Sequence, residues 1–598
     1  MIVKKKEEED MNSKILNMFI IILIIAFIGG ISYAYDPPKG IPDPADSFST
    51  FGEIDQSTPN TVTKCPAWPS GATTGCYYVD NTDPVATDSS NTYGYPNKPR
   101  LTIPSLTLNA GNFVYVNAGT YAPDLYLKGA GTAANPIWFT GNSTTHPVLS
   151  GGLFVGYNVG ASYAVIENFD WVGSNIKWDV RVTAKDLKID HIIFRNNTAT
   201  GVGTDSDTSF GRIGNTSALT GTWVDYIVIY NNTISGLGDI TSTKDITGVA
   251  AVREVDHLWV LNNDIYAIGS DSVAGCATCS ASPNDFPTNY YIGGNTMYGN
   301  GENCIDLKGV NGVIASENIC YGPFAKEQGN GFTFQMDGSD SCSNVWVLFN
   351  KIHTVGEGIA LRNATKNVYI IGNLIYDISN SYSAQKDTQF GGAVLVANSN
   401  PENIWIVDNT FYDYETHGLN FYSTLDSGEN VKIHGNIFSG RSDETGYEVK
   451  VLQNGSEAYI DLDYNLFYGY GGTSRFYWAN DTRTYSYMTG TASECANCVD
   501  GSNPTFVSPS SDLSLQSGST CIGANIEGPV GASVYDAFYT AYSLDIKKDY
   551  LGTVRPQGSG WDIGAYEYYE DDSKASFLQT ATGMTIQYSA SGITVVNN

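Results

Sequence analysis

The sequence has few charged residues, and basic ones are the scarcest. Asp, Glu, Lys and Arg make up 16% of the 598 residues, and 32 basic side chains stand against 62 acidic ones, so the net charge is −30. An excess of negative charge argues against nucleic acid or an anionic membrane surface as partner. The scarcity of charge also argues against a coiled coil or helical bundle, since those folds depend on Glu, Lys, Ala and Leu.

Common nucleotide and zinc motifs are absent as well. The chain has no Walker-type phosphate loop and no His-Glu-x-x-His motif. What is abundant is 63 Gly and 40 Tyr, a composition typical of strands joined by many turns. Single cores stop growing at roughly 250–300 residues, so a chain of this length is either multidomain or a repeat structure.

The N-terminus predicts export. Met11 to Lys14 precede a predominantly apolar run, residues 15–28, which is followed by small residues up to Ala34. This order is typical of a secretory signal, so we expect residues 1–34 to be removed and the protein to be secreted or held at the cell surface. The alternative is an uncleaved anchor, because about 20 residues are enough to span a bilayer. Membrane contact is expected only through such a segment or a surface anchor.

Export makes disulfides plausible for the ten cysteines. Two Cys-x-x-Cys pairs, Cys276/Cys279 and Cys495/Cys498, are also compatible with one shared zinc site. The two pairs lie more than 200 residues apart and have no histidine nearby, so disulfides or free thiols are favoured. The cysteines are 65, 76, 276, 279, 304, 320, 342, 495, 498 and 521.

One short sequence motif recurs from about residue 160: a run of residues with high β-propensity, then Asn, any residue, and a large apolar residue. Irregular spacings with a shortest value of 23 residues are typical of a solenoid with insertions. Asn suits a bend between strands because it tolerates the left-handed conformation, and its amide can bond the same amide one coil away. We expect a structural role for all of these residues: Asn168, Asn232, Asn263, Asn295, Asn318, Asn350, Asn373, Asn409, Asn436 and Asn465.

This pattern resembles the right-handed parallel β-helix of pectate-lyase-like proteins over residues 76–498. The resemblance implies an all-β solenoid with small appendages, here an extension at 35–75 and the residues after 498. It does not fix the activity, since the fold hosts lyases, hydrolases, esterases, adhesins and phage tailspikes.

Residues 499–570 show a second resemblance. Arg555-Pro556 and Trp561-Asp-Ile-Gly-Ala-Tyr-Glu567 are similar to the terminal module called choice-of-anchor Q, which is associated with surface display. The tail, 571–598, contains two strand-like runs around a turn and predicts a hairpin, or alternatively the start of a sorting signal.

Alternation along the strand that follows each Asn bend predicts which side chains point outward. When coils are aligned by hand, one outward column is rich in basic residues. In parallel strands ~4.8 Å apart, Lys308 and Arg362 would have Cα atoms roughly 10 Å apart with Gln335 between them. The predicted column is Arg253, Lys308, Gln335, Arg362, Val396, Tyr422 and Lys450.

The resemblance implies a polysaccharide lyase that cleaves uronic-acid glycans by β-elimination. Such an enzyme must neutralise the carboxylate, remove the proton at C5 and protonate the departing O4. By resemblance to β-helix lyases, Lys308 is the base and Arg362 the acid or carboxylate clamp, and Glu302 and Asp306 bind calcium as the cofactor. The glycan would contact the other members of the column, Arg253, Gln335, Tyr422 and Lys450.

Two alternatives stay open. Lys308 and Arg362 are equally compatible with solvated side chains that form salt bridges to Asp306, Glu302 or Glu357. The protein as a whole is also compatible with a non-catalytic adhesin, carbohydrate-binding protein or structural component of the cell surface. The enzyme requires Lys308, Gln335 and Arg362 to line one groove beside a carboxylate cluster.

Overall fold

A computed structural model describes residues 36–44 and 75–569, and the backbone of 584–589 and 592–597. Within 75–569 the description omits 106, 123, 157–158, 174–177, 184–186, 202–210, 216–222, 242–245, 254, 276–286, 323, 325, 327–328, 337–340, 364, 383–390, 398–401, 426–429, 442–445, 470–473, 510 and 529–532. The predicted signal segment and Cys65, Cys276 and Cys279 therefore lie outside the described residues. Among the described helices, none has the length and apolar character needed to cross a membrane.

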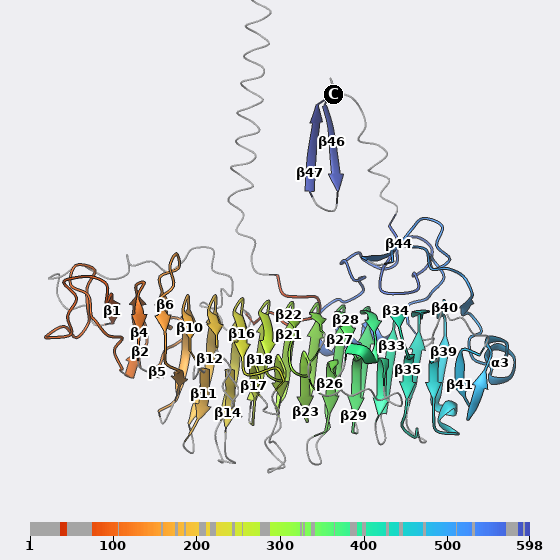
Figure 1. Cartoon of the computed structure of the whole chain (residues 1–598), viewed down its shortest axis with the longest axis horizontal. Coiled ribbons are helices and arrows are strands. Elements are labelled where there is room, and N and C mark those ends of the chain that lie inside the picture. The colour runs from red at the N-terminus through yellow and green to blue at the C-terminus, as the bar shows by residue number, and fades with distance from the viewer. Residues whose placement is uncertain are drawn as a thin grey trace, which may run out of the picture. The chain divides into compact units, whose positions relative to one another are not determined.

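The chain divides into two compact units. The first unit comprises Met1–Gly238, Ile246–Ile265 and Ala281–Asn295, and the second comprises Asp239–Asp245, Tyr266–Ser280 and Thr296–Asn598. In each unit the chain forms coils of three short strands, and strands of successive coils lie side by side in parallel sheets (Figure 1). We name these sheets I, II and III in the order in which a coil enters them. The expectation of an all-β parallel β-helix is confirmed.

The first unit contains the following strands. Sheet I has β1 (Cys76–Val79), β3 (Phe113–Val116), β6 (Ile137–Gly141), β9 (Ala161–Glu167), β12 (Lys188–Arg195), β15 (Trp223–Tyr230), β18 (Val255–Leu261) and β21 (Thr288–Gly293). Sheet II has β4 (Thr120–Tyr121), β7 (Val148–Leu149), β10 (Asp170–Val172), β13 (Thr198–Thr200) and β16 (Thr233–Leu237). Sheet III has β5 (Leu125–Ala130), β8 (Leu153–Val155), β11 (Trp178–Val182), β14 (Gly211–Asn215) and β17 (Val249–Ala251), and β2 (Thr107–Asn109) pairs with β5.

The second unit repeats the arrangement. Sheet I has β24 (Asn311–Ser316), β27 (Ser343–Leu348), β30 (Lys366–Ile371), β33 (Glu402–Val407), β36 (Val431–His434) and β39 (Ile460–Asp463). Sheet II has β22 (Thr296–Tyr298), β25 (Ile319–Tyr321), β28 (Lys351–Val355), β31 (Leu374–Ile378), β34 (Thr410–Tyr414), β37 (Ile437–Ser439), β40 (Leu466–Tyr468) and β43 (Val499–Asp500). Sheet III has β20 (Val273–Gly275), β23 (Ile305–Lys308), β26 (Asn330–Gln335), β29 (Glu357–Arg362), β32 (Gly392–Ala397), β35 (His417–Phe421), β38 (Tyr447–Val451) and β41 (Phe476–Trp478). The strand β19 (Asp264–Ile268) begins in the first unit and ends in the second.

The repeated asparagines form a buried ladder at the bend between sheets I and II. In the second unit the side-chain oxygen of Asn373 accepts hydrogen bonds from the backbone N–H and the side-chain amide of Asn350, at 2.8 and 2.9 Å. Asn373 in turn donates to Asn409 in the same two ways, both at 2.9 Å. In the first unit Asn232 donates likewise to Asn263. The predicted structural role of the ladder is confirmed.

Two details of that prediction are wrong. The left-handed residue at each bend is the one before the ladder Asn, for example Asn231 (φ 51°) before Asn232 and Phe349 (φ 53°) before Asn350. Asn168 occupies this preceding position (φ 63°), so Phe169, and not Asn168, lies at the ladder level. The division of labour has a physical reason, because the ladder amide must point inward while its neighbour reverses the chain.

Residues 499–569 pack onto coils of the second unit. They contain the hairpin β44 (Phe506–Ser508) and β45 (Asp512–Leu515) and the helix α4 (Val534–Tyr542). The N–H groups of Gly564 and Ala565 donate to Gly435 O and to Thr410 Oγ1, at 2.7 and 3.0 Å. The solenoid's short pieces are η3 (Asn380–Tyr382), η4 (Ser456–Tyr459), β42 (Asp481–Arg483), α3 (Tyr485–Tyr487) and η5 (Met488–Ala492), and the tail forms the predicted hairpin of β46 (Met584–Ser589) and β47 (Gly592–Asn597).

The described cysteines agree with the preference for disulfides and free thiols over a zinc site. Cys304 is bonded to Cys320, and Cys495 is bonded to Cys498. Cys342 and Cys521 are buried free thiols.

Candidate functional site

The outward positions of sheet III in the second unit carry the residues that the sequence predicted. Ile305, Phe332 and Ile359 are fully buried and occupy the core side of neighbouring strands. The alternate positions point outward, and Lys308 is in register with Gln335 on the next coil. Arg362 follows Leu361, which pairs with Phe334, so Lys308, Gln335 and Arg362 lie in one outward column.

Two members of the predicted column, Val396 and Lys450, are in the wrong register. Val396 pairs with Leu361 and is only 1% exposed, so it belongs to the core, and Ala397 takes the place next to Arg362. Lys450 pairs with Asn420 and therefore lies in the adjacent outward column, which contains Asp306, Thr333 and Ala360. The error arose because segments of different length separate the coils, and a one-residue slip moves a side chain to the other face of the strand.

Tyr422 and Arg253 are placed separately. Tyr422 follows Phe421, which pairs with Val396, so Tyr422 keeps its predicted column as a half-buried side chain. Arg253 lies just after β17 in the first unit.

Both basic residues proposed for catalysis form ion pairs. Lys308 Nζ lies 3.0 Å from Asp306 Oδ2, and Gln335 Nε2 donates to Asp306 Oδ1 at 2.8 Å. Arg362 Nη2 lies 3.0 Å from Glu357 Oε2. Asp306 and Glu357 are almost fully buried, whereas Lys308 and Arg362 are partly exposed. The salt-bridge alternative therefore describes the geometry of both cations.

The electrostatics around Lys308 favour its protonated form. Burial lowers the pKa of Lys308, but the carboxylates of Asp306, Asp271 and Glu302 more than offset that effect, so the pKa is raised. Burial, followed by repulsion from Asp306 and Glu302, raises the pKa of Asp271 well above its ordinary value. A lysine base requires a lowered pKa, so this environment is opposite to the one that the predicted role of Lys308 needs.

The predicted calcium ligands are engaged within the protein. Asp306 accepts from Lys308 and Gln335, and Glu302 Oε2 accepts the hydroxyl of Ser270 at 2.8 Å. Among the residues that the structure describes, the one group of three potential metal ligands whose atoms all lie within 4.8 Å is elsewhere, in the first unit. It consists of Asp225, Asp256 and His257.

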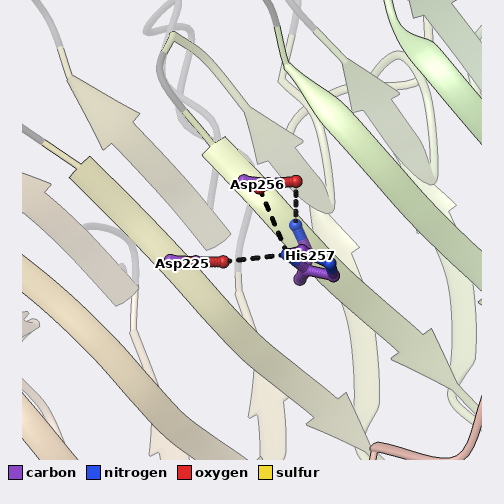
Figure 2. A group of neighbouring side chains, drawn as sticks. All are labelled: Asp225, Asp256 and His257. Carbon is purple, nitrogen blue, oxygen red and sulfur yellow. Dashed lines mark hydrogen bonds and ion pairs between the residues drawn. The ribbon is translucent and has the colours of Figure 1, made fainter. Parts of the chain in front are cut away.

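Figure 2 shows that His257 interacts with both carboxylates of this group. Asp225 on β15 and Asp256 on β18 are in register, and His257 Nδ1 lies 3.1 Å from Asp225 Oδ1 and 3.2 Å from Asp256 Oδ2. Burial lowers the pKa of His257, but hydrogen bonds to both carboxylates outweigh it and raise the pKa to about 9. Calcium prefers six to eight oxygen ligands, and a protonated imidazole between two carboxylates does not fit it. No step is therefore assigned to calcium here.

A pair that the sequence did not predict lies farther along sheet III of the second unit. The backbone N–H of Tyr447 donates to His417 Nδ1 at 3.1 Å, which leaves the ring proton of His417 on Nε2. Lys450 Nζ lies 3.2 Å from that Nε2. An ammonium group would bring two donors together, so a neutral amine is the form that completes the contact.

The environment of the pair lowers the pKa of both groups. Burial lowers the pKa of Lys450. Burial and the neighbouring Lys450 lower the pKa of His417 to about 3. Two tyrosines adjoin the pair: Tyr447 is in register with His417, and Tyr477 with Lys450. The sequence signal was slight, because His417 and Lys450 lie 33 residues apart and meet only through coil register.

No protein-family model matches the chain, and no curated protein sequence matches it. Solved structures that resemble it include the A-module of mannuronan C-5 epimerase AlgE4 from Azotobacter vinelandii, at 15% identity over 62% of this chain and 88% of that one, with a TM-score of 0.37. A mannuronic acid-specific polysaccharide family 6 lyase from human gut microbiota is similar at 13% identity over 64% and 89%, with a TM-score of 0.37. XylC in complex with xylose is similar at 12% identity over 83% and 98%, with a TM-score of 0.46.

Proposed function

We propose that this protein is a polysaccharide lyase that cleaves a uronic-acid glycan by β-elimination, with Lys450 as the base. The observation that carries the proposal is the 3.2 Å contact between Lys450 Nζ and His417 Nε2. A neutral amine completes this contact, and burial lowers the pKa of Lys450, which is the direction that a general base on an outward strand position requires.

The chemistry follows from the substrate class. The proton on C5 of a uronic acid is acidic because it lies next to the carboxylate. Lys450 removes it, the C5 electrons form the C4–C5 double bond, and O4 departs with a proton supplied by an acid. The phenol of Tyr477, one coil from Lys450 in the same column, is the donor in this proposal.

Lys308 and Arg362 take a different role from the one predicted from the sequence. Because Asp306 and Glu357 neutralise them, Lys308 and Arg362 are assigned contacts with the glycan's hydroxyl groups, away from the bond that breaks. Gln335, Tyr422 and, in the first unit, Arg253 remain proposed glycan contacts. Export and surface display through residues 499–570 belong to the same proposal.

The closed ion pairs of Lys308 and Arg362 favour a second candidate, a non-catalytic glycan-binding protein of the cell surface. A base and an acid are then unnecessary, and the His417–Lys450 pair only stabilises the coil. The two candidates differ in whether an unsaturated product forms.

The test is to incubate the purified protein with alginate, pectate and glycosaminoglycans and to follow ultraviolet absorbance from the C4–C5 double bond. Solvent deuterium incorporation at C5 would report proton removal even without cleavage. We expect Lys450→Met to lower the rate by about 10²–10⁴-fold, the usual contribution of a general base. The matched control is Lys432→Met, because Lys432 is ion-paired with Asp461 on sheet I.

If no glycan of the panel gives product or deuterium exchange and glycan binding is retained, the lyase proposal is contradicted and the glycan-binding protein is supported. An unchanged rate in Lys450→Met would remove Lys450 from the mechanism.

A further inference from the structure

The outer side of sheet III in the first unit carries a second column of aromatic and charged residues, in which Phe154 and Asp179 are buried and Arg212 is half-buried. Tyr126 on β5, Phe154 on β8, Asp179 on β11 and Arg212 on β14 are in register on successive coils. Their spacing along the column is ~4.8 Å per coil. Arg181 lies two residues after Asp179, on the same face of β11.

Arg212 lacks a counter-charge of its own. The carboxylate of Asp179 forms a short ion pair with Arg181. On its other side Arg212 faces the methyl group of Ala250. In the part of the chain that the structure describes, the side chain of Arg212 makes no hydrogen bond and no ion pair, although its backbone pairs with the strands on both sides.

This arrangement costs free energy unless an anion completes it. Burial and the neighbouring Arg181 lower the pKa of Arg212 by more than the attraction of Asp179 raises it, so the guanidinium is partly dehydrated and repelled. A half-buried charge that shares its counter-charge with a second arginine is unfavourable. Among the described residues of this column, two guanidinium groups stand against one carboxylate, on a chain whose net charge is −30.

We propose that Arg212, with Arg181 beside it, binds the carboxylate of an acidic glycan that lies along sheet III of the first unit. A guanidinium presents two parallel N–H donors that match a carboxylate, and such bidentate pairs are short and strong. The stacked rings of Tyr126 and Phe154, whose centroids are 5.0 Å apart, form an apolar wall at the start of the column. Apolar surroundings strengthen the attraction between opposite charges.

The choice of a uronic-acid glycan as ligand rests on the proposed function, whereas the anion site rests only on Arg212 and its neighbours. Binding is therefore measured separately from cleavage. Fluorescently labelled oligouronates prepared from alginate and pectate are titrated with the full chain, and anisotropy is recorded at fixed ionic strength. A neutral oligosaccharide of equal length and a sulfated one serve as comparisons.

We expect Arg212→Gln to weaken oligouronate binding at least tenfold. Arg212→Lys is expected to weaken it less, because lysine keeps the positive charge but lacks the two parallel N–H donors of the guanidinium. The matched control, Arg483→Gln, removes an arginine that is ion-paired with Asp481 in the second unit and is expected to bind normally. Circular dichroism confirms that each variant is folded.

Equal oligouronate binding by Arg212→Gln and the unmodified chain would overturn the inference. Tighter binding of the sulfated oligosaccharide than of the oligouronates would also overturn it, since the site would then take sulfate. The two proposals fail separately. Binding that depends on Arg212 without any elimination product would support this inference and contradict the lyase proposal. Product formation with a KM that does not change in Arg212→Gln would support the lyase proposal and contradict this inference.

Discussion

The contact that Lys450 makes depends on a hydrogen bond in which Lys450 takes no part. Because the backbone N–H of Tyr447 occupies His417 Nδ1, the other ring nitrogen carries the proton and points at Lys450. The backbone thus selects the tautomer that His417 presents to Lys450. A lysine on the same face without such a partner, Lys308, has a raised pKa because carboxylates surround it.

The lowered pKa of Lys450 predicts that the rate of elimination depends on pH. The pKa of Lys450 is lowered by burial, so the amine is neutral above that pKa and gains a proton as the pH falls through it. We expect the rate of elimination to fall on the acid side, and His417→Ala to shift that fall to higher pH, because water then reaches Lys450. The measurements are the pH profile of kcat/KM and the ¹³C chemical shift of the Lys450 Cε.

The NMR readout keeps the prediction testable in the absence of catalysis. A Lys450 that titrates like a free lysine in the unmodified chain, or a titration unaffected by His417→Ala, would show that the histidine does not control the lysine. Lys432, paired with Asp461, is the reference lysine.

At the scale of the element, the asparagine ladder stabilises the bend between sheets I and II. The side-chain oxygen of Asn373 accepts two hydrogen bonds from one neighbouring coil, and its backbone N–H and side-chain amide donate to the other, so losing the side chain leaves donors and acceptors unpaired on both sides. Asn373 is fully buried and also donates to Val347 O at 2.8 Å. Buried polar groups that lose their partners cost about 1–3 kcal/mol each.

We therefore expect Asn373→Ala to lower the free energy of unfolding by about 3–5 kcal/mol. The measurement is urea unfolding followed by circular dichroism. The control is Asn367→Gly, which removes a half-buried member of a second asparagine row on sheet I, where Asn367 donates to Asn344 at 3.1 Å. Asn367 has a φ of 50°, which glycine adopts freely, so its loss is expected to cost less than about 1 kcal/mol. Equal costs for the two variants would contradict a special role for the buried ladder.

How much the sequence predicts depends on the range of the interaction. The ladder can be predicted from the sequence because Asn recurs at the same bend of successive coils, and its hydrogen bonds join equivalent positions. The sequence alignment of coils places Lys308, Gln335 and Arg362 correctly, because the coils there are short. It misplaces Val396 and Lys450, because inserted segments obscure where the strand begins. The His417–Lys450 contact and the unpaired Arg212 depend on register and burial, which no local pattern encodes.

At the scale of the whole molecule, the net charge of −30 opposes association with an acidic glycan. Binding therefore depends on local sites where positive charge exceeds negative. Lys308 and Arg362 do not create such an excess, because Asp306 and Glu357 neutralise them. The average composition argues against nucleic acid as partner but says nothing of these local balances.

The residues after 498 join the second unit through a buried polar network. Asp408, fully buried on the solenoid, accepts hydrogen bonds from the hydroxyl of Tyr535 on α4 and from the side-chain amide of Asn525, at 2.5 and 2.6 Å. Burial raises the pKa of Asp408 to about 6, although Arg555 and these donors act against the shift. Arg555 donates to Asp562 O and Gly564 O, which connects the Trp561–Glu567 segment to this network.

The network predicts a destabilisation that depends on pH. Because the folded-state pKa of Asp408 lies above its ordinary value of 3.8, the stability that its proton contributes is present below about pH 4 and is lost as the pH rises through about 6. Above pH 6 the buried carboxylate depends on its donors, so Tyr535→Phe is expected to cost about 2–3 kcal/mol at pH 7.5 and about 1 kcal/mol at pH 5. Urea unfolding at both pH values measures the difference, and Tyr539→Phe, which changes an exposed tyrosine of the same helix, is the control. A cost for Tyr535→Phe that is the same at both pH values would show that the hydroxyl does not stabilise the charged carboxylate, and that packing alone holds α4 on the solenoid.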